Sequence, residues 1–200
     1  MNGRKRIYLV RHGQVVGHER RPVYGHTDVE ITHVGRLQME HLAERLRFAD
    51  LKAIYSSDLK RSAIGGRIIG RYHDVPHHEL RDLREMHFGD WEGLTLADLH
   101  ELFPKKLDRR KNDIVNFRPP GLGESIGELS QRVMPCLQGI LERHQDEDIL
   151  LIGHGGVNRV ILCHALGLSL ENIFRFQQDY GCLNIIDNFF DSTLVRLLNG

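Results

Sequence analysis

The stretch IYLVRHG at residues 7–13 runs four apolar or aromatic residues into an arginine, a histidine and a glycine. The apolar run predicts a buried strand at residues 6–10, so the polar residues follow its carboxyl end. The pattern returns at residues 149–156, where ILLI runs into GHGG. Because ligands bind outside the carboxyl ends of the strands in an open α/β sheet, we expect His12 and His154 to face one crevice.

The rest of the chain alternates short apolar runs with longer segments of helical periodicity, which is the order of an α/β sheet with crossover helices. Thr32 and Ser125 each precede a helical stripe and are predicted to cap it, Ser125 with capping-box spacing. The cluster SSD at residues 56–58 predicts another helix start. The expected strands are residues 6–10, 51–55, 149–152, 182–187 and 193–198, and the expected helices are 33–46, 59–71, 126–144 and 157–166.

Charge and cysteine content exclude several classes of protein. Lysine plus arginine and aspartate plus glutamate number 27 each, so net charge offers no steering toward nucleic acid or a membrane. The three cysteines show no CxxC spacing, which indicates reduced thiols and a cytoplasmic location. No signal-peptide pattern opens the chain, and no apolar run nears the roughly eighteen residues of a membrane span. We expect one domain over residues 1–200, with no nucleic-acid or membrane partner.

The longest irregular segment covers residues 87–123 and contains one helical piece capped by Thr95. We call this segment the excursion. Irregular segments of this length in a compact domain are usually lids or binding loops, so we expect it to select the substrate. Its basic run KKLDRRK at residues 105–111 is interpreted as a solvated face that could also gather anionic substrates.

Two arginines and the glycines after the strands indicate an anion site. A guanidinium group matches the oxygens of a carboxylate or a phosphate, and a glycine lets backbone N–H groups approach an oxyanion. Arg61 lies one turn into a helix whose positive end also favours an anion. Each feature alone is ordinary, because such histidines are usually structural and such arginines usually lie on the surface. Since neutral imidazole can attack phosphorus, Arg11, His12 and Arg61 together point to phosphoryl chemistry.

An ordered set of motifs resembles the histidine phosphatase superfamily, which includes the cofactor-dependent phosphoglycerate mutases. The resemblance covers nearly the whole chain. It implies an α/β protein with a three-layer α/β/α sandwich, in which a mostly parallel central sheet carries helices on both faces. The motifs are RHG at 11–13, GHTDVEITHVG at 25–35, SSDLKR at 56–61, LREMHFGDWEG at 83–93, GES at 123–125 and GHGG at 153–156.

The resemblance also implies a role for each matching residue. His12 would be the nucleophile that forms a phosphohistidine, and Glu85 would be the general acid. Arg11 and Arg61 would clamp phosphate oxygens, while His154 would hydrogen-bond the transferring group from the opposite side. The scheme requires no metal or other cofactor, and its partner would be a small phosphorylated metabolite. The residues implied in phosphate or substrate binding are Arg11, Arg61, His154, Gly155, His18 and Thr27.

Departures from the mutase pattern favour the phosphatase branch of the family. That branch includes α-ribazole-5′-phosphate phosphatases and broad phosphomonoesterases. Only about thirty residues separate REMHFGDWEG from GES, whereas the mutases carry ERHYG followed by a large insertion. His18 stands where the mutases usually have asparagine, and RSAIGG at residues 61–66 replaces RAxxTA. Leu122 reads as an addition before GES, in PPGLGES. These three departures leave the fine geometry of the substrate open, and they remove none of the five central residues.

Several alternatives stay open. Phosphoglycerate mutase-type transfer is one, and a catalytically silent phospho-ligand binding module is another, although such a module would be expected to have lost His12 or Glu85. The histidines at 73, 77 and 78 lack ordered carboxylate or cysteine partners, so we interpret them as a solvated loop rather than a metal site. The sequence does not determine the oligomeric state, and a homodimer is one option.

Overall fold

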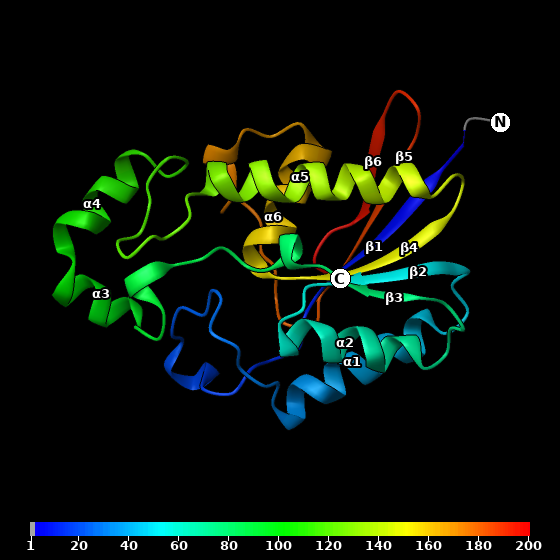
Figure 1. Cartoon of the computed structure of the whole chain (residues 1–200), viewed down its shortest axis with the longest axis horizontal. Coiled ribbons are helices and arrows are strands. Elements are labelled where there is room, and N and C mark those ends of the chain that lie inside the picture. Colours follow the sequence, from blue (N-terminus) through cyan, green and yellow to red (C-terminus); the bar gives the residue numbers. More distant parts are fainter. Residues whose placement is uncertain (1–2) are drawn as a thin grey trace.

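The computed structural model describes residues 3–200, and its centre is a six-stranded sheet (Figure 1). The strands are β1 (Lys5–Arg11), β2 (Leu51–Ser56), β3 (His77–Glu79), β4 (Asp148–Gly153), β5 (Leu183–Asn188) and β6 (Thr193–Leu197). They lie in the order β3-β2-β4-β1-β5-β6. The first four strands are parallel, β5 runs antiparallel to β1, and β6 runs antiparallel to β5. The sheet is therefore mostly parallel, as predicted.

Helices cover both faces of this sheet. They are α1 (His33–Leu46), α2 (Lys60–Gly70), α3 (Leu96–Leu102), α4 (Pro104–Asn112), α5 (Ile126–Arg143) and α6 (Gly155–Leu166). Helices α1 and α2 pack on one face, and α5 and α6 pack on the other (Figure 1). The predicted three-layer sandwich is confirmed. Short 3-10 helices lie at His18–Arg20, Arg81–Leu83, Gly89–Trp91 and Leu170–Asn172.

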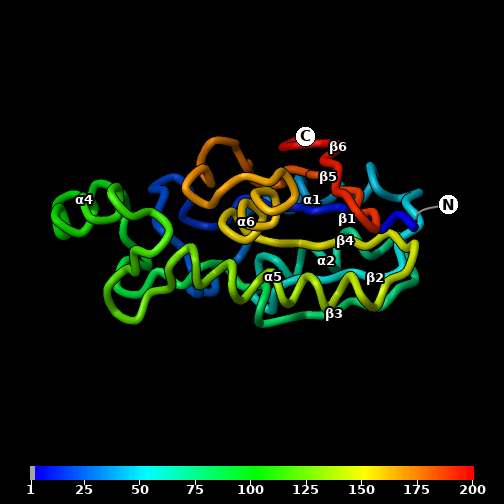
Figure 2. Tube along the Cα trace, turned by 90° about the horizontal axis from the view of Figure 1, so that it is seen from above, coloured from blue at the N-terminus to red at the C-terminus, as the bar shows by residue number. Residues whose placement is uncertain are grey.

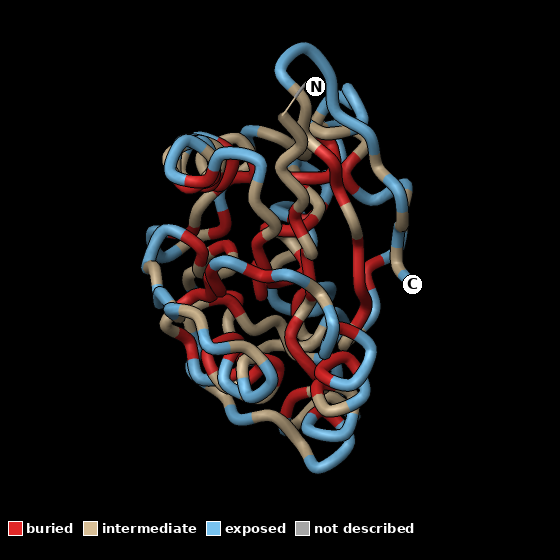
Figure 3. The backbone as a smooth tube through the Cα atoms, turned by 90° about the vertical axis from the view of Figure 1, so that its right-hand side faces the viewer, coloured by how far each residue is buried: buried red, intermediate tan, exposed pale blue. Residues whose placement is uncertain are grey.

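The apolar runs of β1 and β4 fill the core on both sides of the sheet. Successive residues of a strand point to opposite faces, so a strand covered on both faces is apolar throughout. Leu9 and Leu151 pack beneath α5 and α6, while Val10 and Ile152 pack against α1 and α2. The buried parts of the chain form the interior, and exposed segments surround them (Figure 3). Polar residues at the ends of these strands are thus held on a rigid base.

Most predicted helix ends are confirmed by their caps. Thr32 accepts a hydrogen bond from Gly35 N, and Ser125 forms a capping box with Glu128. Helix α6 stops at Gly167, whose φ of 66° lies in the left-handed region. The expected cap of α2 at residues 56–58 is wrong. Instead, the carboxylate of Asp28, from a distant loop, accepts from Lys60 N at 2.8 Å.

Two other expectations are wrong, and the excursion contains one helix more than expected. His77 and His78 form the edge strand β3 rather than a solvated loop, and His77 Nε2 bonds Ser56 Oγ at 2.8 Å. Helix α6 begins at Gly155, two residues before the expected start. The basic run at residues 105–111 belongs to a second helix of the excursion, α4. Of its basic side chains, Arg110 is half-buried and the others are exposed.

The excursion has a small core of its own. Trp91, Leu99 and Leu107 are buried together, and the Trp91 ring stacks on Phe117 with centroids 5.4 Å apart. Helices α3 and α4 project from the end of the sheet where β1, β2 and β4 finish (Figure 1, Figure 2). None of the helices within residues 3–200 has the length and apolar character needed to cross a membrane.

Candidate active site

The carboxyl ends of β1 and β4 meet, as predicted. Arg11 lies opposite Gly153 in the ladder, and His12 N donates to the carbonyl of Gly153 at 3.2 Å. The rings of His12 and His154 make an edge contact with centroids 5.1 Å apart. Both side chains are buried. We call His12, His154, Arg11 and Arg61 the strand-end cluster.

The ring of His12 is fixed in one tautomer. Its Nδ1 lies 2.8 Å from the carbonyl oxygen of Gly13, which can only accept, so Nδ1 carries the hydrogen. Nε2 therefore keeps its lone pair. Burial, together with the positive charges of Arg11 and Arg61, holds the pKa of His12 well below its ordinary value of 6.5. His12 is thus a neutral imidazole at pH 7, which is the form that can act as a nucleophile.

The turn after His12 requires two glycines. A Cβ atom on Gly13 would lie 2.2 Å from the carbonyl oxygen of Gly35, and one on Gly35 would lie 2.2 Å from the carbonyl oxygen of Gln14. Backbone therefore packs directly on backbone, which places the residues after β1 against the first turn of α1. This contact explains why both RHG and the motif at residues 25–35 end in glycine.

Arg61 is buried and held by backbone carbonyls. Its Nη1 donates to the carbonyl of Thr27 at 2.8 Å, and its Nη2 donates to that of Gly25 at 2.6 Å. Burial lowers the pKa of Arg61, and the charges of Glu85, Asp28 and Glu92 partly oppose this. Because a guanidinium group stays charged in proteins, Arg61 is a fixed cation beside the two histidines.

Arg11 is anchored by the segment that precedes β5. Its Nη1 donates to the carbonyl of Gln178 at 2.6 Å, and its guanidinium group lies 4.1 Å from the ring centre of Tyr180. Nε of Arg11 is buried without a hydrogen-bond partner among the described residues. A buried N–H of this kind is available to an anionic ligand.

His154 follows β4 and precedes the first turn of α6. Its Nε2 is hydrogen-bonded to Ser57 Oγ at 2.7 Å, whereas its Nδ1 is buried and unpartnered among residues 3–200. Burial and the charge of Arg61 hold the pKa of His154 well below 6.5. The ring is therefore neutral, and Ser57 determines its orientation.

Glu85 reaches the same place from a different part of the chain. Its carboxylate accepts hydrogen bonds from Gly156 N at 2.9 Å and from Met86 N at 2.8 Å. A Cβ atom on Gly156 would lie only 2.4 Å from Glu85 Oε1. The last glycine of GHGG, Gly156, thus leaves room for the Glu85 carboxyl group at the start of α6.

The other residues predicted to bind phosphate or substrate differ in position. Gly155 lies in the cluster, and a Cβ atom there would lie 3.6 Å from the Arg11 guanidinium. Thr27 holds Arg61 through its carbonyl, while its hydroxyl donates to Glu92. His18 lies in the 3-10 helix His18–Arg20, where its Nδ1 is 3.4 Å from Glu19. The described contacts join His18 to no member of the strand-end cluster.

Residues 7–199 match the histidine phosphatase superfamily (branch 1). The chain belongs to this family. The adenosylcobalamin/alpha-ribazole phosphatase of Salmonella typhimurium is 27% identical over 194 residues, which cover 97% of this chain and 96% of that protein. The metal-independent phosphoserine phosphatase of Arabidopsis thaliana is 33% identical over 157 residues, which cover 78% of this chain and 66% of that protein.

Solved structures agree with this assignment. The alpha-ribazole phosphatase from Shigella flexneri superposes with a TM-score of 0.88 and 28% identity, over 98% of this chain and 96% of that one. The predicted family and enzyme class are confirmed, and the chain is a phosphomonoesterase of the histidine phosphatase superfamily.

Several residues of this histidine phosphatase site were not anticipated from the sequence. Glu92 accepts hydrogen bonds from the backbone of His26, Thr27 and Phe88 and so fixes the loop that holds Arg61. Burial raises the pKa of Glu92, but these bonds outweigh burial and lower it overall. Glu92 lies inside the motif at residues 83–93, and this position is the only feature of the sequence that could have identified it as a site residue.

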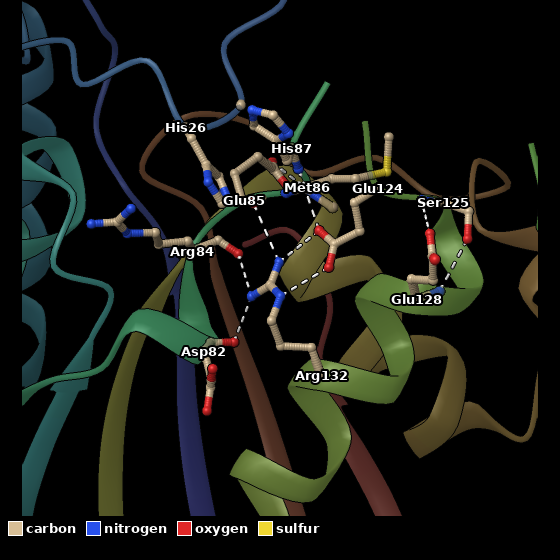
Figure 4. A network of polar contacts seen from close by, with 12 residues as sticks. His26, Asp82, Arg84, Glu85, Met86, His87, Glu124, Ser125, Glu128 and Arg132 are labelled. Carbon is tan, nitrogen blue, oxygen red and sulfur yellow. Dashed lines mark hydrogen bonds and ion pairs between the residues drawn. The ribbon is translucent and has the colours of Figure 1, made fainter. Parts of the chain in front are cut away.

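Arg132 of α5 holds the segment that carries Glu85 (Figure 4). It donates to the carbonyls of Asp82 at 2.7 Å and Arg84 at 3.1 Å, and it forms an ion pair with Glu124 at 2.7 Å. No local pattern in the sequence marks this arginine.

A pocket opens beside the cluster between α4, α6 and the loop after α6. Arg110 and Arg159 lie 5.5 and 5.7 Å from the ring centre of Phe174, so two cations share one aromatic ring. Burial lowers the pKa of both arginines, yet neither forms an ion pair within residues 3–200. The pocket also includes Arg11 and Glu85, and its apolar wall consists of Met86, Phe88, Ile126, Leu129, Ile173 and Phe174.

Proposed function

We propose that the chain is a metal-independent phosphomonoesterase that hydrolyses a small phosphorylated metabolite through a phosphohistidine on His12. The observation that carries this proposal is the neutral ring of His12, whose Nε2 keeps its lone pair. Arg11 and Arg61 lie close enough to lower the pKa of that ring. A neutral imidazole between two guanidinium groups suits attack on a phosphoryl group whose charge they offset.

The reaction divides into two steps. In the first, Nε2 of His12 forms a bond to phosphorus while the ester P–O bond breaks, and the carboxylic acid of Glu85 protonates the departing alkoxide. In the second, the Glu85 carboxylate takes a proton from water, whose oxygen attacks phosphorus and breaks the P–N bond. Inorganic phosphate leaves and His12 returns to its neutral form. Arg11, Arg61 and the free Nδ1 of His154 bind phosphoryl oxygens.

Metal independence is supported by the way the site handles charge. The guanidinium groups of Arg11 and Arg61 can offset the negative charge that a metal ion would otherwise neutralise. A relative at 33% identity carries the name metal-independent phosphoserine phosphatase.

The substrate has two candidate classes. Similarity over 97% of the chain to an adenosylcobalamin/alpha-ribazole phosphatase supports α-ribazole 5′-phosphate. The pocket at Arg110 and Arg159 favours a leaving group that carries a second anion, such as a carboxylate. A phosphomonoester has a charge of about −2 at pH 7, which Arg11 and Arg61 balance. Arg110 and Arg159 then leave two unpaired cations beside the leaving group, and the excursion acts as the lid that brings Arg110 there.

The first test is turnover of p-nitrophenyl phosphate in the presence of EDTA. We expect release of p-nitrophenol at a rate that EDTA does not reduce. Loss of activity that magnesium restores would contradict metal independence. Tight binding of inorganic phosphate without any release would favour the silent binding module.

A substrate panel then identifies the class of ester. It contains α-ribazole 5′-phosphate, phosphoserine and the matched pair 3-phosphoglycerate and glycerol 3-phosphate, which differ by a carboxylate. A higher kcat/KM for 3-phosphoglycerate than for glycerol 3-phosphate would support the anionic leaving group. Preference for α-ribazole 5′-phosphate over every anionic ester would contradict it. Efficient formation of a bisphosphate from 3-phosphoglycerate would favour the mutase.

A further inference from the structure

The segment that carries Glu85 has little regular structure to hold it. Residues 84–88 lie between two short 3-10 helices and form neither helix nor strand. Backbone carbonyls away from water need hydrogen-bond partners, and a segment without them adopts several conformations. Arg132 donates to two partly buried carbonyls of this segment, those of Arg84 and Glu85, and to the exposed carbonyl of Asp82 just before it (Figure 4).

We infer that Arg132 is a positioning residue that places the acid Glu85, an inference that rests on the proposed function. Its Nη2 lies 3.4 Å from the carbonyl oxygen of Glu85. The same carbonyl accepts from His26 Nε2 at 3.0 Å. Because burial and the charge of His87 lower the pKa of His26, its ring is neutral and donates through Nε2–H. The guanidinium group is a planar fork, so these bonds fix the direction of the Glu85 backbone.

Arg132 also joins Glu85 to the base of the excursion. Its Nε and Nη2 donate to the two carboxylate oxygens of Glu124 at 2.9 and 2.7 Å. Glu124 N donates to the carbonyl of His87 at 2.7 Å, and His87 N donates back to the Glu124 carboxylate at 3.3 Å. His87 begins the excursion and Glu124 directly follows it. The acid and the lid therefore share one anchor on α5.

Within residues 3–200, Arg132 donates no hydrogen bond to the strand-end cluster. Its loss should therefore impair the step that needs a proton from Glu85 more than the binding of phosphate. Esters with poor leaving groups depend on that proton, whereas p-nitrophenolate departs with little help. The dependence of rate on the leaving group is thus a signature that a purely structural role would not change.

The test compares Arg132→Met and Arg132→Lys with the control Arg118→Met. Arg118 makes the same kinds of contact from a more exposed position: it donates to the carbonyl of Gly123 at 3.1 Å and pairs with Glu128 at 3.2 Å. Among the described residues it donates to no carbonyl of residues 82–85. The measurement is kcat/KM for p-nitrophenyl phosphate and for glycerol 3-phosphate, with thermal unfolding recorded for each variant. We expect Arg132→Met to lower the rate on glycerol 3-phosphate at least about ten-fold more than that on p-nitrophenyl phosphate.

Arg132→Lys keeps the charge and some donors, so its extra loss of kcat/KM on glycerol 3-phosphate should be smaller than that of Arg132→Met. Arg118→Met should lower kcat/KM for the two esters by the same factor. Equal losses on both esters in Arg132→Met, or the same extra loss on glycerol 3-phosphate in Arg118→Met, would overturn the inference. If Arg132→Met does not fold, the test uses Arg132→Lys and Glu124→Gln instead. The inference then requires both variants to lower the ratio of kcat/KM for glycerol 3-phosphate to that for p-nitrophenyl phosphate. Failure of the proposed function would be recognised separately, because the wild-type protein would then form no phosphohistidine.

Discussion

The strand-end cluster and the excursion achieve order in opposite ways. His12 sits on backbone that packs against backbone, with Gly13 so close to Gly35 that a Cβ atom would lie 2.2 Å from its carbonyl oxygen. The excursion instead encloses a separate small core around Trp91 and projects from the sheet (Figure 2). The first region permits almost no change of side chain, whereas the second can change its surface while its core persists.

From this difference we infer that the two regions have different roles. In the proposed function, the rigid region binds the phosphoryl group, which is the same in every phosphomonoester. The excursion contributes Arg110 to the pocket that we propose for the leaving group, which is the part that differs among substrates. Substitutions in the two regions should therefore have effects that differ in size and in kind.

The largest effect is expected from His12→Ala. This variant removes the covalent path, so turnover should fall at least about 10⁴-fold, in keeping with the loss of other enzyme nucleophiles. Binding of inorganic phosphate should partly survive through Arg11 and Arg61, which calorimetry can measure. Turnover close to that of the wild type, in a preparation free of contaminating phosphatase, would show that another residue is the nucleophile.

The next largest effect is expected from Glu85→Gln. General acid catalysis contributes about 10²–10⁴-fold, so alkyl esters such as glycerol 3-phosphate should lose activity in that range. The loss on p-nitrophenyl phosphate should be much smaller, because its leaving group needs little protonation. Parallel assays of the two substrates give the comparison. If both rates fall equally, the proton comes from elsewhere.

A smaller effect should appear in the pH dependence of the free energy of unfolding. It concerns the strand-end cluster, because this cluster contains two buried histidines. The pKa values of His12 and His154 are lowered on folding, so the unfolded chain binds more protons near pH 6. The stability that the two neutral histidines contribute is fully present above pH 6.5. It is lost as the pH falls below 6.5, because the unfolded chain then takes up protons that the folded histidines do not. Each histidine adds a slope of at most about 1.4 kcal/mol per pH unit.

Urea unfolding at pH 7.5, 6.5 and 5.5 measures this slope. The variant His12→Gln removes one of the two histidines, so its stability should fall less steeply with acidification than that of the wild type. Other histidines titrate alike in both proteins and cancel in the difference. An identical slope in the variant would mean that His12 is protonated equally in the folded and unfolded states.

The smallest effect is expected in the excursion. Arg110→Gln should lower the ratio of kcat/KM for 3-phosphoglycerate to that for glycerol 3-phosphate by about ten-fold, since one charge-assisted hydrogen bond is lost. Arg109→Gln removes an exposed cation from the same helix and is the matched control. An equal drop in the ratio for both variants would indicate general attraction of anions rather than a pocket at Arg110.

The same contrast explains how much could be predicted from the sequence. The strand ends and the caps at Thr32 and Ser125 depend on residues close together in the chain, so local patterns predicted them. The edge strand β3 was missed because its three residues, HHE, show no apolar alternation. Helix α4 was missed because its charged run buries only one apolar side chain, Leu107.

Long-range partners could not be predicted for a related reason. Asp28 caps a helix 32 residues away, and Arg132 bonds carbonyls 47 to 50 residues before it. Neither contact leaves a periodic or spaced pattern in the sequence. The family resemblance supplied the positions of Glu85 and His154, but not the side chains that hold them in place.

The central claim is that His12 carries the phosphoryl group, and rapid quenching with labelled substrate tests it most directly. We expect a short-lived, acid-labile and base-stable adduct that peptide mapping locates on His12, formed in the presence of EDTA. His12→Ala should form none. Label on a serine or an aspartate, or an adduct that requires a divalent metal, would contradict the account.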